Sequence, residues 1–188
     1  MKIAITGTIG SGKSTVADYI RKSGFHVFSC DEYNKELLEK DNKGYSLIKK
    51  EFPDAFDGNI LNKAKLADII FKDKESKNKL ESILHPLIKE KMLKEAEENE
   101  IFFAEVPLLF EVGYQIFFDR NILVVCDEDI ALRRLVDRGL ELNDSRKRIM
   151  NQMSVSDKEK LADEIIYNNN DLSGLYRQVD KILDTYVR

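Results

Sequence analysis

The feature that most constrains this chain is a glycine-rich motif near its N-terminus. Residues 7–14 read GTIGSGKS and fit the pattern G-x-x-x-x-G-K-[ST]. An apolar run at residues 2–6 precedes the motif, and apolar side chains at helical spacing follow it as far as residue 24. The motif therefore lies between a predicted strand and a predicted helix, the setting in which it forms a phosphate-binding loop, or P-loop. An ordinary glycine turn is the alternative, and the match of motif and setting together weighs against it.

The motif also predicts the ligand. Backbone N–H groups of such a loop turn inward around phosphate oxygens, and the dipole of the following helix favours negative charge there. Lys13 is placed to reach the β and γ phosphates, and the Ser14 hydroxyl is placed to hold Mg²⁺. We therefore expect a nucleoside triphosphate with magnesium. A guanine-specific switch is disfavoured, because no Asn-Lys pair in the chain has Asp two positions after its Lys.

Five apolar runs predict the strands of a sheet: residues 2–6, 25–30, 101–106, 121–126 and 164–167. Four of them are almost continuously apolar, which is typical of parallel strands covered on both faces by helices. Helical patterns alternate with these runs, and the last forms an apolar stripe over residues 175–186. The sequence predicts an α/β fold with a doubly wound, five-stranded parallel sheet.

A long connection separates the second and third predicted strands. Residues 31–100 fill it, whereas a crossover between parallel strands needs only about a dozen residues. Its apolar spacing is helical, and Pro86 is expected at the first position of a helix. We predict a single domain, residues 1–188, whose core (residues 1–30 and 101–188) carries a helical insertion.

Two acidic residues are predicted at strand ends, where doubly wound sheets place their ligands. The Asp31 carboxylate could accept the proton of an attacking hydroxyl or hold a magnesium-bound water, or it could cap a helix that begins at Glu32. Glu105 could assist in holding magnesium, or it could form an exposed salt bridge. The residues alone leave these alternatives open.

Positive charge gathers after the fourth predicted strand. The segment contains Arg133, Arg134, Arg138, Arg146, Lys147 and Arg148. Phosphoryl transfer spreads negative charge over the moving group, so a mobile lid that carries arginine suits a small kinase. We predict a lid at about residues 138–156. For any single arginine, a solvated helix face is the alternative.

Composition excludes several function classes. The 188 residues include 30 Lys and Arg against 34 Asp and Glu, a net charge of −4, whereas domains that bind nucleic acid are usually strongly basic. No apolar run approaches the roughly 20 residues that cross a bilayer, and the start of the chain lacks a signal-peptide pattern. The two cysteines, Cys30 and Cys126, belong to no metal-binding cluster. We expect a cytoplasmic monomer with no nucleic-acid or membrane partner.

Three further motifs carry a resemblance to a known family. They read LHPLI (residues 84–88), VPLLFE (106–111) and ADEIIYNN (162–169), and they follow the P-loop and Asp31 in order. With these motifs the chain resembles the dephospho-coenzyme A kinases, a P-loop family of small-metabolite kinases, over essentially its whole length. The resemblance implies ATP-dependent phosphorylation of the 3′-hydroxyl of dephospho-coenzyme A, the last step of coenzyme A biosynthesis. It also implies that the insertion is a helical, acceptor-binding domain.

The resemblance further implies roles for individual residues. The phosphates of ATP would be held by Gly10, Ser11, Gly12, Lys13, Ser14 and Thr15, with Mg²⁺ at Ser14. Asp31 would be the catalytic base, aided by Lys13 and the lid residue Arg138. Asn168 would lie near the adenine.

Two motif residues are predicted to bind the acceptor, namely His85 and Glu111. For His85, a cap or turn residue at a helix start is the alternative. The chain departs from the family pattern at two positions, since Ser29 and Tyr167 stand where the family commonly has Asp. Another small-metabolite or nucleoside monophosphate kinase, or a nucleotide-gated binding protein, are the alternative functions.

Overall fold

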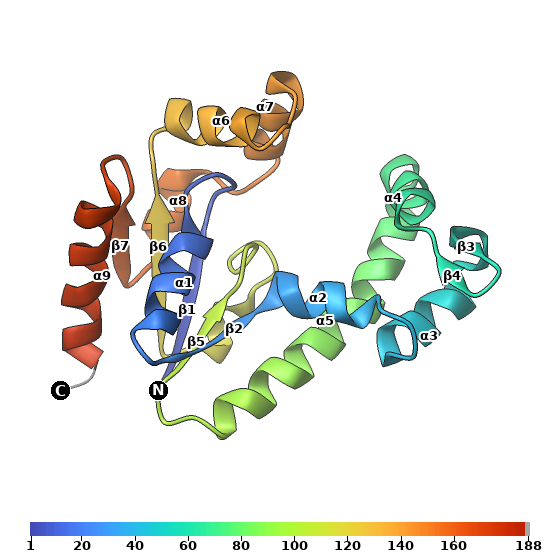
Figure 1. Ribbon diagram of the computed structural model, residues 1–188, viewed down its shortest axis with the longest axis horizontal. Helices are drawn as coiled ribbons and strands as arrows, with labels where there is room; N and C mark the ends of the chain where they lie inside the picture. The colour runs from blue at the N-terminus through green and yellow to red at the C-terminus, as the bar shows by residue number, and fades with distance from the viewer. Residues whose placement is uncertain (187–188) are drawn as a thin grey trace. The chain divides into compact units, whose positions relative to one another are not determined.

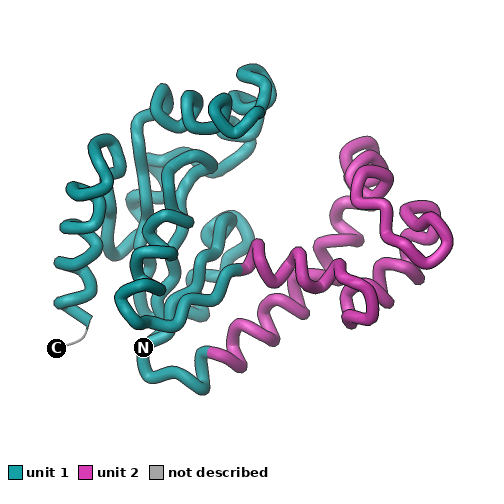
Figure 2. Tube along the Cα trace, viewed as in Figure 1, with its two compact units in different colours: residues 1–29, 96–188 teal, residues 30–95 magenta. Residues whose placement is uncertain are grey.

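The computed structural model describes residues 1–186, so the last two residues of the predicted domain range lie outside the described part. Among the described residues, Met1–Ser29 and those from Ala96 onward form one compact unit, unit 1. Cys30–Glu95 form a second, unit 2, inserted into the first along the chain (Figure 2). Each unit has its own secondary structure and is described by itself.

A five-stranded parallel sheet forms the centre of unit 1 (Figure 1). Its strands are β1 (Lys2–Gly7), β2 (His26–Ser29), β5 (Phe102–Glu105), β6 (Arg120–Val125) and β7 (Glu164–Tyr167). Their order is β2-β5-β1-β6-β7, and every neighbouring pair is parallel. The predicted doubly wound sheet is confirmed, with each strand end within one residue of its predicted position.

The strand order determines where a ligand can bind. β1 lies in the middle, with β5 and β2 on one side and β6 and β7 on the other. The chain therefore reverses its direction of strand addition at β1, and in open α/β sheets the crevice beyond the strand ends at such a point takes the ligand. The loop that leaves β1 is the predicted P-loop.

Two helices cover one face of this sheet, α1 (Lys13–Lys22) and α9 (Leu172–Tyr186) (Figure 1). Side chains of alternate strand residues point toward them, because side chains along a strand alternate between faces. Fully or almost fully buried members of this core are Ile3, Ile5, Val16, Ile20, Phe103, Ile122, Val124, Ile166, Leu175 and Val179. The predicted C-terminal stripe is thus the buried face of α9.

The segment between β6 and β7 is helical. It comprises α6 (Glu128–Asp137), α7 (Leu142–Met150) and α8 (Val155–Glu159), and a short 3₁₀ turn, η2 (Tyr114–Phe117), precedes β6. In Figure 1, α6 and α7 lie above the loop that joins β1 to α1. The predicted lid range therefore covers α7 and the turns on either side of it.

Unit 2 contains α2 (Cys30–Leu37), α3 (Lys43–Glu51), α4 (Lys63–Lys72) and all but the last two residues of α5 (Lys74–Glu97). The 3₁₀ turn η1 (Pro53–Ala55) leads into a small hairpin of β3 (Phe56–Asp57) and β4 (Ile60–Leu61). The helical pattern of the insertion gave no sign of this hairpin, because its strands are only two residues long. No helix among residues 1–186 combines the length and apolar character needed to cross a membrane.

The prediction that Pro86 begins a helix is wrong. Pro86 lies in the interior of α5, whose buried side chains include Leu80 and Leu84 before it and Leu87 and Ile88 after it. An interior proline removes one backbone hydrogen bond and costs about 3 kcal/mol. The apolar stripe continues through the proline, so tertiary burial outweighs that local cost.

Candidate active site

The glycines of the P-loop are explained by backbone geometry and by close neighbours. Gly10 and Gly12 have φ values of 82° and 97°, in the left-handed region that favours glycine. A Cβ at Gly12 would lie 2.2 Å from the Asn168 side-chain nitrogen, and one at Gly10 would lie 2.8 Å from the Ala131 carbonyl oxygen. At these two positions there is room for backbone only, so the loop packs closely against Ala131 and Asn168.

The helix that follows the loop begins without a side-chain cap. Lys13 is the first residue of α1, and Gly12 at the N-cap supplies no side-chain hydrogen bond. The first N–H groups of a helix have no partner within the helix, and together with the helix dipole they bind anions. The start of α1 is thus suited to phosphate, as the motif predicted.

A serine and a glutamate meet beside the loop. The Ser14 hydroxyl donates a hydrogen bond of 2.6 Å to Glu105 Oε1. Glu105 is the last residue of β5, in register with Ile5 of β1 and Ser29 of β2, and it is only 6% exposed. The alternative of an exposed salt bridge for Glu105 is therefore wrong. The pair supplies a hydroxyl and a carboxylate, both of which are oxygen ligands suited to Mg²⁺.

Arg134 braces the P-loop from α6. One guanidinium nitrogen donates to the carbonyl oxygens of Gly10 (3.3 Å) and Ser11 (3.2 Å), and the other donates to the Asn168 carbonyl at 3.1 Å. The Asn168 side chain in turn donates to the Ser11 carbonyl at 2.7 Å. These bonds hold the carbonyl groups of the loop away from the ligand side, which favours inward-facing N–H groups.

A cavity of about 440 Å³ adjoins the start of α1. It is lined by Gly12, Thr15, Arg134, Asp137, Arg138, Asn168, Asn170, Asp171 and Leu172. The structure thus brings the predicted residues Arg138 and Asn168 to one cavity with the P-loop. Sequence analysis counted Arg134 only as one of several arginines, although its position between the buried Ala131 and Leu135 signalled the inward face of α6.

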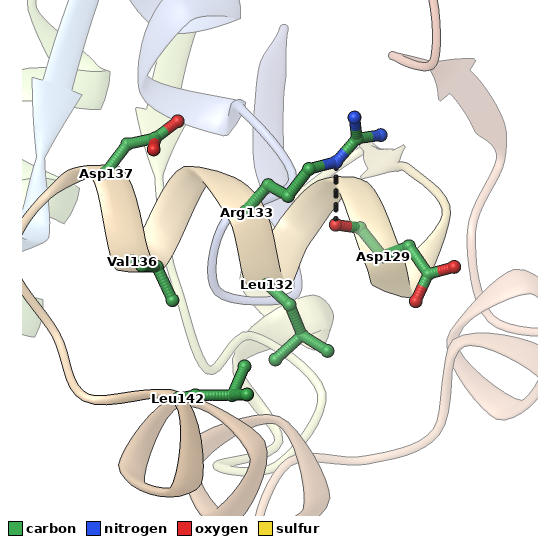
Figure 3. Close-up of a pocket in the computed structure, with 6 residues that line it drawn as sticks. All are labelled: Asp129, Leu132, Arg133, Val136, Asp137 and Leu142. Carbon is green, nitrogen blue, oxygen red and sulfur yellow. Dashed lines mark hydrogen bonds between the residues drawn. The ribbon is translucent and has the colours of Figure 1, made fainter.

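Another cavity, of about 500 Å³, lies between α6 and α7 (Figure 3). Leu132, Val136 and Leu142 point toward it, and Arg133 donates through Nε to the Asp129 carbonyl at 3.3 Å. No P-loop residue lines it. We assign it no part in the chemistry.

Glu111 is held by the segment before β7. Its Oε1 atom accepts a hydrogen bond from the Met153 backbone N–H (3.1 Å) and lies 2.8 Å from Lys158 Nζ. The Lys158 side chain is fully buried. Acceptor binding by Glu111 stays a prediction, and sequence analysis missed Lys158 altogether.

Two predicted site residues belong to unit 2. Asp31 is the second residue of α2, is exposed, and within residues 1–186 its carboxylate forms no hydrogen bond or ion pair. The alternative that Asp31 caps a helix beginning at Glu32 is wrong, because α2 already begins at Cys30. His85 is half-buried in the interior of α5, so it is not a cap either. The catalytic and acceptor-binding roles of these residues stay predictions.

Cys126, at the end of β6, lies beside the loop but is not activated. Its sulfur is 3.8 Å from the Gly10 carbonyl oxygen. Burial raises the pKa of the Cys126 thiol above its ordinary value, despite the positive charge of Arg134 nearby. The thiol is therefore protonated near neutral pH and is a poor nucleophile.

Comparisons with known proteins agree with this geometry. A family model described as dephospho-CoA kinase matches residues 1–174. The chain is 34% identical to a dephospho-CoA kinase of Fusobacterium nucleatum, with 98% of each chain covered. It is 35% identical to one of Aquifex aeolicus, with 100% of this chain and 98% of that chain covered.

Solved structures give the same result. A Campylobacter jejuni dephospho-CoA kinase superposes with a TM-score of 0.73 at 28% identity, covering 99% of this chain and 98% of the other. A Thermus thermophilus protein superposes with a TM-score of 0.87 at 32% identity, covering 98% and 97%. A shikimate kinase from Bacteroides thetaiotaomicron reaches a TM-score of 0.60 at 14% identity, with 100% and 99% covered, and so shares the fold.

Proposed function

This chain belongs to the dephospho-CoA kinase family, and from that premise we propose how its residues divide the work of transferring a phosphoryl group from ATP to the 3′-hydroxyl of dephospho-CoA. Such transfer requires little covalent chemistry from the protein. Catalysis is mostly positioning and charge stabilisation. The roles below are assigned on that basis.

The P-loop and its lysine bind the phosphates of ATP. Backbone N–H groups from Gly10 to Thr15 surround them, and the Lys13 ammonium neutralises charge on the β and γ phosphates. Arg138 stabilises the charge that spreads over the transferred group, and Asn168 lies toward the adenine in the cavity beside Gly12.

Ser14 and Glu105 suit magnesium. Mg²⁺ is usually held by one or two protein oxygens together with waters and substrate phosphates, so a full protein cage is not required. The 2.6 Å contact between the Ser14 hydroxyl and the Glu105 carboxylate supplies such oxygens next to the phosphate site. We assign Ser14 as a ligand and Glu105 as the group that orients a magnesium-bound water. The metal would supply positive charge to the phosphates.

Asp31 is the proposed general base. A ribose hydroxyl is a poor nucleophile near neutral pH, and a positioned carboxylate that takes its proton raises the rate. Asp31 follows the end of β2 by two residues and has an unpartnered carboxylate. With Ser29 at the position where the family commonly has a second Asp, no neighbouring Asp substitutes for it. His85 and Glu111 remain the proposed acceptor-binding residues.

This proposal rests on two neighbouring features: the start of α1 has no side-chain cap, and the Ser14 hydroxyl in its first turn donates a hydrogen bond to Glu105. Together they place an anion site and a magnesium site within one helical turn. The direct test is ADP release by the purified chain with ATP, Mg²⁺ and a panel of acceptors. We expect rapid turnover with dephospho-CoA and little with AMP, CMP or shikimate. Equal turnover with another acceptor, or nucleotide binding without acceptor-dependent turnover, would contradict the proposal.

We also propose that residues 31–100 bind the acceptor and that the lid at about 138–156 closes over ATP. Hydrogen exchange tests this, because lids and substrate domains are among the less stable parts of a structure. Dephospho-CoA should protect amides within residues 31–100, and ATP should protect amides around Arg138. Acceptor protection confined to α9 would contradict the assignment. Cytoplasmic location and a monomeric state stay predictions.

A further inference from the structure

A side chain from the segment between α7 and α8 contacts the tip of the P-loop. The Ile9 backbone N–H donates a hydrogen bond of 2.8 Å to Gln152 Oε1. The two residues are 143 positions apart in the sequence, and Gln152 is half-buried. The contact therefore joins the predicted lid range directly to the phosphate-binding loop.

The orientation of the Gln152 amide follows from this bond. A backbone N–H can only donate, so the amide oxygen must face Ile9, and the Nε2 amine faces elsewhere. Within residues 1–186, Nε2 forms no hydrogen bond. The side chain is thus held at one end and retains two donors at the other.

The backbone on either side of Gln152 is fixed. The Gln152 N–H donates to the Ile149 carbonyl, which closes the last turn of α7. The next residue, Met153, donates to Glu111 Oε1, which also pairs with the fully buried Lys158. A buried ion pair with an additional backbone hydrogen bond holds its partners in one geometry. Gln152 therefore projects toward the loop from a segment whose backbone is hydrogen-bonded at Gln152 and at Met153.

Ile9 occupies a particular end of the loop. The phosphate-holding residues proposed above run from Gly10 to Thr15, and among them Lys13 is the one that reaches the β and γ phosphates. Ile9 directly precedes this stretch, four residues before the start of α1. A contact at Ile9 therefore acts on the loop immediately before its phosphate-holding residues.

From these contacts we propose that Gln152 is a positioning residue for phosphoryl transfer: by holding the Ile9 N–H, it fixes the tip of the P-loop and so aligns the terminal phosphoryl group of ATP. This inference rests on the proposed function. An error of about 1 Å in the position of a reacting group lowers a rate by about 10²-fold, so a single hydrogen bond at this place has a large effect.

The test compares three variants of the full chain. Gln152→Met has a similar shape but no acceptor for Ile9. Gln152→Glu keeps an acceptor oxygen and adds a negative charge. Asn151→Ala is the matched control, because Asn151 is exposed and adjacent and its side chain forms no hydrogen bond within residues 1–186. Steady-state turnover of dephospho-CoA, the Kd of ADP and the Tm are measured for each.

Gln152→Met should lower kcat about 10- to 100-fold, with the KM for ATP, the Kd of ADP and the Tm close to those of the wild type. Gln152→Glu should recover most of kcat but raise the KM for ATP, since a like charge repels the bound nucleotide equally in the ground state and the transition state. Asn151→Ala should behave as the wild type.

Three results would overturn the assignment. Wild-type kcat in Gln152→Met would show that the bond does not align the phosphoryl group. Parallel losses of Tm, ADP affinity and kcat would indicate a purely structural role, and equal kcat values for the Met and Glu variants would exclude the acceptor as the cause. A wild-type chain without acceptor-dependent turnover would instead contradict the proposed function itself, and the alignment role with it.

Discussion

The P-loop region and unit 2 treat polar side chains in opposite ways. Every buried polar or charged side chain found in residues 1–186 lies in unit 1, and several of them surround the loop: Thr6, Thr8, Ser11, Glu105 and Asn168. In unit 2 the charged groups pair at the surface, as in Lys63–Glu39 and Lys72–Asp68, where more than half of each side chain is exposed.

This difference teaches how each part obtains its specificity. A buried polar group is costly unless it is hydrogen-bonded, so the hydrogen bonds of Glu105 and Asn168 favour one arrangement of the groups around the P-loop. Exposed ion pairs contribute about 0 to 1 kcal/mol each, so unit 2 depends on its apolar interior for stability, and its surface charges can change freely. A substitution of a functional residue in unit 2 should therefore change activity without changing stability. A substitution near the P-loop should in some cases change both.

The strongest test of that separation is Asp31→Asn. Because Asp31 is exposed and its carboxylate has no partner among residues 1–186, loss of its charge should leave Tm and the KM for ATP unchanged. Loss of a general base should lower kcat by about 10²- to 10⁴-fold. Kinetics and thermal melting on the same preparation check this. A kcat within about threefold of the wild type would remove Asp31 from the mechanism.

Lys13→Ala should lower turnover by about 10²- to 10³-fold, the effect typical of one preorganised charge-stabilising group. Lys13 stands at the first position of α1 and is half-buried, so the fold should persist, as circular dichroism can verify. Lys22→Ala, at the exposed last position of the same helix, is the control and should stay fully active. Near-normal activity in a folded Lys13→Ala protein would contradict the P-loop assignment.

A pair of glycine substitutions compares the two regions directly. Gly12 and Gly58 both have left-handed φ values, 97° and 64°, but a Cβ at Gly12 meets Asn168, whereas one at Gly58 meets nothing within 4 Å. Gly58→Ala should cost about 1–2 kcal/mol of backbone strain. Gly12→Ala should cost more and should also weaken ATP binding, as denaturant unfolding and calorimetry would show. Equal losses would mean that the crowding at Gly12 has no consequence.

The smallest effect concerns unit 1, where the Tyr186 hydroxyl is buried and has no hydrogen-bond partner among residues 1–186. Burial raises the pKa of Tyr186 to about 12. The folded state thus favours the neutral phenol, so its contribution to the free energy of unfolding is complete below about pH 10 and falls between about pH 10 and 12. Tyr186→Phe should lose less stability than the wild type over that interval, whereas Tyr167→Phe, at an exposed tyrosine, should follow the wild type. Identical alkaline unfolding of all three proteins would contradict this.

The sequence predicted those features that local patterns determine. The five strands followed from apolar runs, and the glycine-rich turn between β1 and α1 followed from the motif in residues 7–14, where Gly10 and Gly12 have left-handed φ values. Pro86 was misplaced because local propensity favours a helix start, whereas burial on both sides of it maintains α5. The two-residue strands of the hairpin are too short to show an alternating pattern.

Contacts between distant segments were beyond the reach of pattern analysis. Gln152 meets Ile9, and Lys158 meets Glu111, only because the sheet brings the ends of β1, β5 and β6 to one edge. Arg134 was not distinguished from Arg138, since both lie in a basic segment and only packing shows which one reaches the loop carbonyls. Long-range partners of this kind depend on tertiary structure.

The buried pair of Glu111 and Lys158 also limits how this sequence can evolve. Removing one partner of a buried ion pair costs about 3–5 kcal/mol, while replacing both by apolar residues of similar volume is often neutral. Domains of this kind are stable by only about 5–15 kcal/mol, so either single change takes a lineage through a poorly folded intermediate. The two positions are thus epistatic. A substitution at one of these positions preserves stability only when a compensating substitution at the other position precedes or accompanies it.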